Sequence, residues 1–161
     1  MLKVLVDYPA AADELTVIER ALAEPVAVDQ LLSLDQLAEL QQATRQVYVD
    51  PAVSRYALAI AAATRGLADA GLEDLAPYVE YGASPRGPIN LVLAGRALAL
   101  LRGRRYVLPH DVHELAKDVI RHRMVLTYEA LAEGLEADAI LDRVLEAIPM
   151  PQLDLARTVV A

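Results

Sequence analysis

One arginine stands at the start of an apolar helix, where a cation is unfavourable. The run "GASPRGPINLVLAGRALALL" predicts a helix that begins near Pro85 or Pro88 and places Arg86 at its N-terminus. The helix dipole is positive there, but the free N–H groups of a helix start and the forked donors of an arginine together suit an anion. The residues alone leave two readings open: Arg86 faces solvent or a carboxylate, or it binds an anion such as a phosphate.

Two further basic clusters have residue types that could bind phosphate. They are "RGRR" at 102–105 and "RHR" at 121–123, and each follows an expected helix. Cations at a helix C-terminus interact favourably with the dipole and with the last carbonyl groups. We therefore favour helix capping over phosphate binding for both clusters.

Other reactive side chains do not form a recognisable catalytic or metal site. His110 and His113 have a spacing that can chelate a metal, but Glu114 lies on a different helix face and no third ligand is in register, so no metal site is expected. The chain has no cysteine, which removes thiol catalysis and disulfides. It also has no G-x-x-x-x-G-K-[ST] motif and no readable Ser–His–Asp arrangement. We expect no complete catalytic site in this chain.

The composition suits one compact domain with a sizeable core. The chain has 161 residues, of which 55% are hydrophobic, and a formal net charge of −8. That charge argues against binding to nucleic acid or to an anionic membrane. No apolar run is long enough to cross a bilayer, and the first residues have no signal-peptide core. We expect a cytoplasmic protein with neither a nucleic-acid nor a membrane partner.

Periodicity of the apolar residues predicts an all-α fold, a small bundle of about six helices. Helix ends are marked by Ser33 with Gln36 as a capping box, by Asp50 before Pro51, and by Pro109 at a first helical position. Helices are expected over 10–24, 34–46, 51–66, from near 86 to 101 with Gly103 as C-cap, from 109 to about 120, and over 137–148, with 124–131 as an irregular or β-prone connector.

One segment, "LKVLVDYP" at 2–9, reads as a short strand that ends at Pro9. A single strand cannot make a sheet. Its partners must therefore lie in another molecule or in sequence that this chain does not contain.

Several of these motifs resemble a known family. "LKVLVDYP", "GASPR" (82–86), "GRRYVLPHDV" (103–112) and "HRMVLTYEA" (122–130) occur in the order and near the spacing seen in the C-terminal part of MoxR-family AAA+ ATPases. The resemblance covers residues 1 to about 150. Gly87 and Pro88 depart from it, because the family most often has other residues after the arginine, usually Ala first.

The resemblance implies a fold, a division into segments and a site. Residues 1–9 would be the last strand of an α/β core that carries the Walker motifs, 10–150 the helical lid, and 151–161 a C-terminal tail. Arg86 would be the sensor 2 arginine that reaches the γ-phosphate of ATP, in its own or a neighbouring subunit, with Ser84 and Pro85 as positioning residues.

The resemblance also implies what the whole protein does. It would bind ATP and Mg²⁺, hydrolyse ATP in a homo-oligomeric ring that is expected to be a hexamer, and act as a chaperone-like remodeller in protein maturation or metal insertion, with von Willebrand factor A domain proteins as partners. This chain alone, without Walker motifs, should be inactive. The alternative is a free-standing helical interaction module with no role in nucleotide binding.

Overall fold

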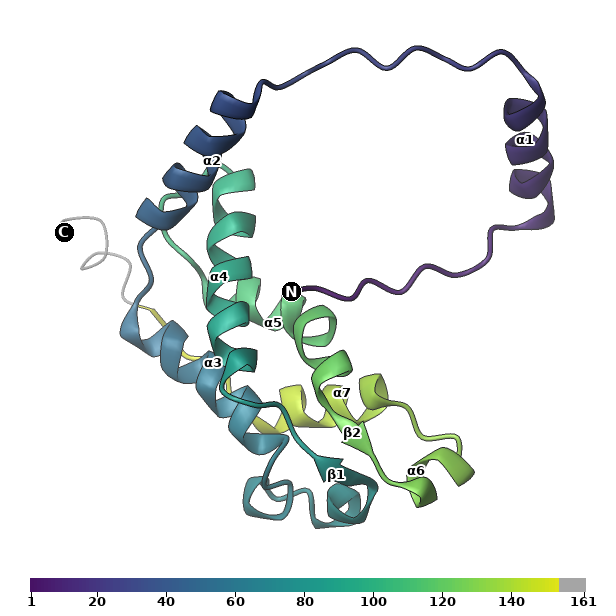
Figure 1. Ribbon diagram of the computed structural model, residues 1–161. Helices are drawn as coiled ribbons and strands as arrows, with labels where there is room; N and C mark the ends of the chain where they lie inside the picture. Colours follow the sequence, from purple (N-terminus) through teal and green to yellow (C-terminus); the bar gives the residue numbers. More distant parts are fainter. Residues whose placement is uncertain (154–161) are drawn as a thin grey trace.

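The computed structural model describes residues 1–153 and confirms an all-α fold (Figure 1). Within that range the chain forms seven α-helices, three short 3₁₀ helices and two short strands. In chain order they are α1 (Ala11–Leu22), α2 (Leu34–Gln46), α3 (Pro51–Ala63), η1 (Ala68–Ala70), η2 (Glu73–Tyr78), β1 (Val79–Tyr81), α4 (Arg86–Leu101), α5 (Pro109–Ile120), η3 (Arg121–Arg123), β2 (Val125–Leu126), α6 (Tyr128–Ala132) and α7 (Ala137–Ala147).

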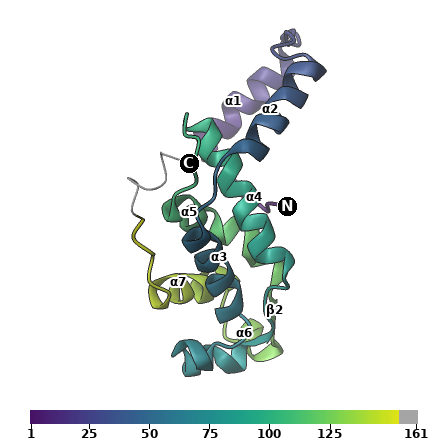
Figure 2. The same ribbon diagram turned by 90° about the vertical axis from the view of Figure 1, so that its left-hand side faces the viewer.

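The core of the bundle forms where α3, α4, α5 and α7 meet. Helix α4 packs against both α3 and α5, and α7 packs against α3 and α5 (Figures 1 and 2). Branched aliphatic and alanine side chains fill this interior, and the largest fully buried apolar ones include Ile60, Leu91, Ile120, Ile140 and Leu141. Their burial supplies the main driving force for folding.

A two-stranded sheet closes one end of the bundle, beside α6 (Figure 1). Strand β1 pairs antiparallel with β2, with Val79 opposite Leu126, and both side chains pack against the core. The segment 124–131 was predicted as an irregular or β-prone connector. It contains β2 and most of α6, and this helix was not predicted. Strand β1 was not predicted, because three residues are too few for a period-2 pattern to show.

Most of the predicted helix ends are confirmed. At α2, Gln36 N–H donates to Ser33 Oγ (3.1 Å) and the Gln36 side chain accepts from Ser33 N–H (2.8 Å), which is the complete capping box. At α3, Asp50 accepts from Ala52 N–H (2.7 Å). Gly103 has φ +71°, so it ends α4 in the left-handed conformation that glycine adopts without strain.

The N-terminal region contributes nothing to the core. Neither α1 nor α2 contains a buried residue, and α1 stands apart from the bundle (Figure 1). The strand predicted at 2–9 is not formed. Its backbone has no partner strand among residues 1–153, and isolated strands lack the ladder hydrogen bonds that stabilise them.

Two hydrogen bonds hold the N-terminal segment to the bundle. Lys3 N–H donates to Asp118 O (2.8 Å), and the Arg121 guanidinium donates to Lys3 O (2.7 Å). Most of the predicted tail, 151–161, lies outside the described residues. Within residues 1–153, no helix combines the length and the apolarity that crossing a bilayer requires.

Candidate functional site

Arg86 is the first residue of α4, and its side chain is exposed. No carboxylate among residues 1–153 forms an ion pair with it. Of the two readings that the residues left open, the structure therefore excludes a carboxylate partner for Arg86 within those residues. The guanidinium is available to a ligand that approaches the start of α4.

The start of α4 offers fewer backbone donors than an ordinary helix start. Of the four positions whose N–H groups normally lack an intrahelical partner, Pro85 and Pro88 have no N–H, and Gly87 N–H donates to Ser84 O (2.8 Å). Only the N–H of Arg86 is left. An anion here would therefore depend on the guanidinium, and the expectation of several free N–H groups is wrong.

The loop before Arg86 is clamped onto the end of α3. Ala83 N–H donates to Thr64 Oγ1 (2.9 Å), and the Thr64 hydroxyl donates to Ala61 O (2.7 Å). The Arg65 guanidinium donates to Ala83 O. Because Thr64 and Ala83 are buried, these bonds are shielded from competing water.

Gly82 makes this clamp possible by its lack of a side chain. A Cβ at this position would lie 2.2 Å from Thr64 O and 2.7 Å from Arg65 N, so the two backbones could not approach as they do. The requirement is steric and not conformational, because Gly82 does not have a positive φ.

Gly87 fixes the start of α4 from the other side. It is buried, and a Cβ there would meet Ile120 Cδ1 at 3.0 Å, Ala83 Cβ at 3.2 Å and Ala61 Cβ at 3.6 Å. The departure from the family pattern at Gly87 thus lets α4 approach α3 and α5 closely. Arg86 lies between two anchored residues, which holds its backbone while its side chain stays exposed.

The two residues that were predicted to position Arg86 both belong to the turn that starts α4. The Ser84 carbonyl accepts the Gly87 N–H, and Pro85 is the N-cap of α4. Sequence reasoning missed Thr64 and Arg65, which hold this loop from about twenty residues upstream. The sequence feature that could have indicated these two residues is the polar pair "TR" directly after the apolar run of α3.

The basic cluster 102–105 is largely neutralised. Arg102 and Arg104 both pair with Asp111, which is buried on α5, and Arg102 also pairs with Glu114 at 2.7 Å. Burial alone would raise the pKa of Asp111, but hydrogen bonds from Arg104 and from Leu108 N–H, with the charges of Arg104 and Arg102, outweigh it and lower that pKa.

The cluster 121–123 has structural partners as well. Arg123 Nε donates to Val119 O (2.9 Å), which caps the last turn of α5 as predicted. Arg121 pairs with Asp138 (2.8 Å) and with Asp118, and the hydrogen bond that Arg121 donates to Asp138 is the largest cause of its raised pKa. Burial, together with nearby cations, lowers the pKa of His122.

The two histidines at the start of α5 are engaged elsewhere. His113 Nδ1 lies 3.1 Å from Tyr56 Oη, and burial raises the pKa of that tyrosine. His110 Nε2 lies 3.8 Å from Glu114. Within residues 1–153, no three histidine or carboxylate side chains gather as metal ligands.

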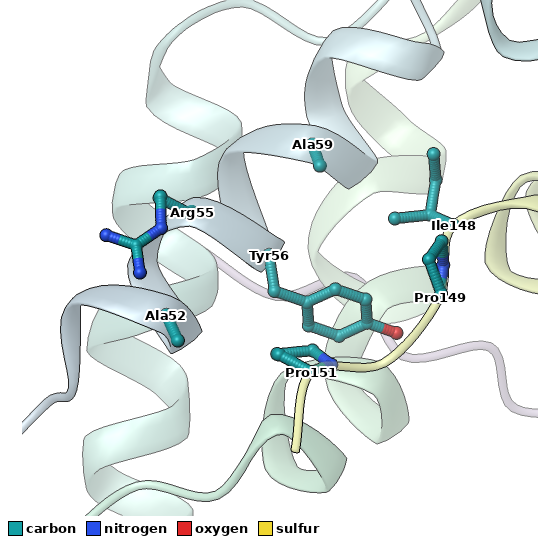
Figure 3. Close-up of a pocket in the computed structure, with 7 residues that line it drawn as sticks. All are labelled: Ala52, Arg55, Tyr56, Ala59, Ile148, Pro149 and Pro151. Atoms are coloured by element: carbon teal, nitrogen blue, oxygen red, sulfur yellow. The ribbon is translucent and has the colours of Figure 1, made fainter. Parts of the chain in front are cut away.

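A small cavity lies between α3 and the segment after α7 (Figure 3). It has a volume of about 380 Å³ and is mainly apolar, lined by Ala52, Arg55, Tyr56, Ala59, Ile148, Pro149 and Pro151. The Tyr56 ring lies against the two prolines, whereas Arg55 points away from the ring. Because the Tyr56 hydroxyl is hydrogen-bonded to His113, the described residues that line this cavity offer no free nucleophile or acid.

Comparison with known proteins agrees with this architecture. Residues 72–144 match the AAA lid domain family. The chain is 38% identical to chaperone MoxR1 of Mycobacterium tuberculosis over 96% of its length, and 40% identical to protein MoxR of Paracoccus denitrificans over 65%. It superimposes with a TM-score of 0.87 on a protein from Cytophaga hutchinsonii that is classed as an ATPase, with 33% identity over 94% of this chain.

The chain is shorter than these relatives. It spans 41% of MoxR1, 32% of the Paracoccus protein and 47% of the Cytophaga chain. The matched lid region contains β1, α4, α5 and α6, and therefore includes Arg86 and both glycines that anchor it. Residues 72–144 are thus an AAA lid domain, and the chain as a whole is a relative of the MoxR proteins.

Proposed function

We propose that this chain is the nucleotide-responsive lid of a MoxR-type AAA+ ATPase and that Arg86 is its sensor 2 arginine. Two observations together carry the proposal: the Arg86 guanidinium is exposed and pairs with no carboxylate among residues 1–153, and its backbone is held on both sides by the close packing at Gly82 and Gly87. Such an arrangement holds a permanent positive charge in a reproducible position and leaves it free to bind a ligand.

In this role Arg86 would act on the terminal phosphate of ATP. An arginine neutralises the charge that is spread over the transferred phosphoryl group, and its binding couples the position of the lid to the state of the nucleotide. Mg²⁺ would neutralise charge on the β- and γ-phosphates, and its ligands, like the Walker motifs, are proposed to lie in the α/β core. Mixed rings, described below, distinguish action of Arg86 on the nucleotide of its own subunit from action on that of a neighbour.

The exposed apolar faces of the N-terminal region support a docked arrangement. On α1, Leu15, Ile18 and Leu22 are 58%, 55% and 84% exposed, although their helical spacing would suit burial. Contact with a core and with neighbouring subunits would cover them. We therefore propose a homo-oligomeric ring, a hexamer, in which residues 1–9 form the last core strand and 10–150 the lid.

The proposal extends to the cellular role. The named MoxR relatives include a chaperone, so we propose a cytoplasmic ATP-driven remodeller that assists protein maturation or metal insertion. Von Willebrand factor A domain proteins are its proposed partners.

The test is the substitution Arg86→Ala in a protein that carries both this lid and the nucleotide-binding core. Because arginines at transferring phosphates contribute on the order of 10³-fold or more, we expect turnover to fall by a similar factor. Nucleotide binding, measured separately, should fall much less. Arg86→Lys keeps the charge but loses the fork, so it should restore only part of the rate.

Arg55→Ala is the matched control, because it removes another exposed arginine that has no carboxylate partner among residues 1–153. It should leave turnover unchanged. Wild-type turnover in Arg86→Ala would refute the sensor assignment. Mixing a catalytically inactive core variant with Arg86→Ala then separates action within a subunit from action between subunits, since only the second restores activity in mixed rings.

A further inference from the structure

A second, larger cavity lies where the end of α2 approaches the C-terminal half of α4. Its volume is about 1000 Å³, and it is lined by Arg45, Gln46, Val47, Tyr48, Val49, Arg96, Gly103, Arg104, Arg105 and Tyr106. Four of these ten residues are arginines and two are tyrosines. We call it the arginine pocket.

Three of the four arginines have no acidic partner. Arg104 is bound by Asp111, but Arg45, Arg96 and Arg105 form no ion pair within residues 1–153. The chain has 23 acidic and 15 basic residues, so carboxylates outnumber cations. Cations that share one cavity repel one another, and an anion in the cavity would remove that repulsion.

Arg96 carries the most direct sign of a missing ligand. It lies in the middle of α4, is partly buried, and its Nε atom is buried without a hydrogen-bond partner, the one such side-chain atom found among the described residues. A buried N–H donor without an acceptor has lost its hydrogen bonds to water and has gained none within the protein, which costs free energy. An oxyanion in the pocket would supply an acceptor.

The backbone of the pocket wall is held by several hydrogen bonds. Tyr48 N–H donates to Arg105 O (2.8 Å), and Val107 N–H donates to Tyr48 O (3.0 Å). Arg104 donates to Tyr106 O (3.2 Å). The free guanidiniums therefore come from three segments, the end of α2, the middle of α4 and the loop after it, and these are fixed relative to one another.

The pocket is separate from the site proposed for ATP. Arg96 is ten residues after Arg86 on the same helix, a rise of about 15 Å. The inference therefore does not rest on the sensor assignment of Arg86, and either can fail without the other.

We propose that the arginine pocket binds the phosphate group of a small molecule. A carboxylate offers two oxygens in one plane and is satisfied by one or two guanidiniums, as Asp111 is by Arg104 and Arg102. A phosphate offers oxygens in several directions, which suits donors that converge from three segments. The volume fits a ligand of small-molecule size, and the chain's net charge of −8 disfavours a nucleic acid.

The test uses the 161-residue chain and inorganic phosphate, pyrophosphate and citrate as probes, at constant ionic strength set with chloride. We expect phosphate and pyrophosphate to shift the arginine Nε–H resonances in NMR spectra, with pyrophosphate binding more tightly. Arg45→Gln and Arg105→Gln remove exposed side chains, so the fold should be kept, and each should weaken binding by about tenfold, the effect of one charge-assisted hydrogen bond. Arg96→Gln should weaken it at least as much.

Two matched controls locate the effect. Arg20→Gln and Arg55→Gln remove exposed arginines outside the pocket and should leave phosphate binding unchanged. Equal weakening in all five variants, or no shift with pyrophosphate at millimolar concentration, would overturn the proposal. Tighter binding of citrate than of pyrophosphate would overturn the choice of phosphate and assign the pocket to carboxylate ligands instead. Comparison of pyrophosphate with a phosphate monoester then distinguishes a free phosphate from an esterified one.

Discussion

At the scale of single residues, the start of α4 depends on two glycines with different tolerances. Gly82 faces the main chain of Thr64, which cannot move without distorting the end of α3. Gly87 faces the far end of the Ile120 side chain and two alanine methyl groups, of which only the first can rotate away. Adding a methyl group should therefore destabilise the fold much more at Gly82 than at Gly87.

We predict that Gly82→Ala lowers the free energy of unfolding by about 3 kcal/mol, as overpacking against a fixed neighbour does. Gly87→Ala should change it by less than about 1 kcal/mol, because the better helix propensity of alanine offsets the tight contacts. Urea unfolding followed by circular dichroism measures both. Equal losses in the two variants would contradict the view that the Gly82–Thr64 approach holds this loop.

The sequence singled out Arg86 as a candidate site residue, but not the residues that hold its backbone. Arg86 could be singled out because it begins an apolar helix and ends the "GASPR" motif. The Thr64 and Arg65 bonds join positions 18 and 19 residues apart, and no local pattern encodes such a pairing. The reduced number of N–H donors was readable from Pro85 and Pro88, once the first residue of α4 was known.

At the scale of elements, α5 begins around a buried charge. Asp111 is the third residue of α5, and its carboxylate accepts a hydrogen bond from the Leu108 N–H (2.8 Å), which is half of a capping box. The same carboxylate also pairs with Arg102 and Arg104, which follow α4. One carboxylate therefore caps α5 and joins it to α4. Removal of this carboxylate would leave two cations without their partner, at a position that is fully buried.

We predict that Asp111→Asn lowers the free energy of unfolding at pH 7 by about 3 kcal/mol, the usual cost of breaking a buried ion pair. Asp142→Asn is the control: it removes an exposed carboxylate that pairs with Lys117, and should cost less than about 1 kcal/mol. Denaturant unfolding measures both. A loss at Asp111 no larger than that at Asp142 would show that the buried network is not stabilising.

The same carboxylate predicts a pH dependence. Its pKa is lower in the folded chain than in the unfolded chain, so its stabilising contribution is complete above the unfolded pKa of about 3.9 and is lost as the pH falls through the folded pKa. The difference in stability between the wild type and Asp111→Asn should therefore be constant near neutral pH and shrink below pH 4. Unfolding curves at pH 7 and pH 3 test this, and a constant difference would contradict it.

Helices with a local cap signal were predicted to within a residue at their starts, as Ser33, Asp50 and Pro109 show. Elements that form only by pairing with a distant segment were not predicted correctly. Strand β1 exists only through its pairing with β2, 44 or more residues later, and the strand predicted at 2–9 is absent because nothing in the described part of the chain pairs with it. Local rules thus located the longer helices but missed α6, and of the strands they indicated only β2, within the β-prone segment 124–131.

At the scale of the whole molecule, residues 47–148 form a packed bundle to which α1 adds no buried side chain. A helix of 12 residues is marginal in water without tertiary contacts. We predict that amides of α1 exchange with deuterium close to the rate of an unstructured peptide, whereas those of α3 and α4 are strongly protected. Protection of α1 equal to that of α4 would show that it packs on a surface, of this or another copy.

The sparse helix start at Arg86 has a consequence for how long a ligand stays. A phosphate cradled by several backbone N–H groups leaves only when many bonds break together, whereas one held by a single side chain can leave as that side chain changes rotamer, on a time scale of nanoseconds. In the proposed sensor role, the contact between Arg86 and a phosphate should therefore form and dissolve within each catalytic cycle without delaying product release. Retention of the nucleotide would be governed by the other parts of the site, and the lid would report its state.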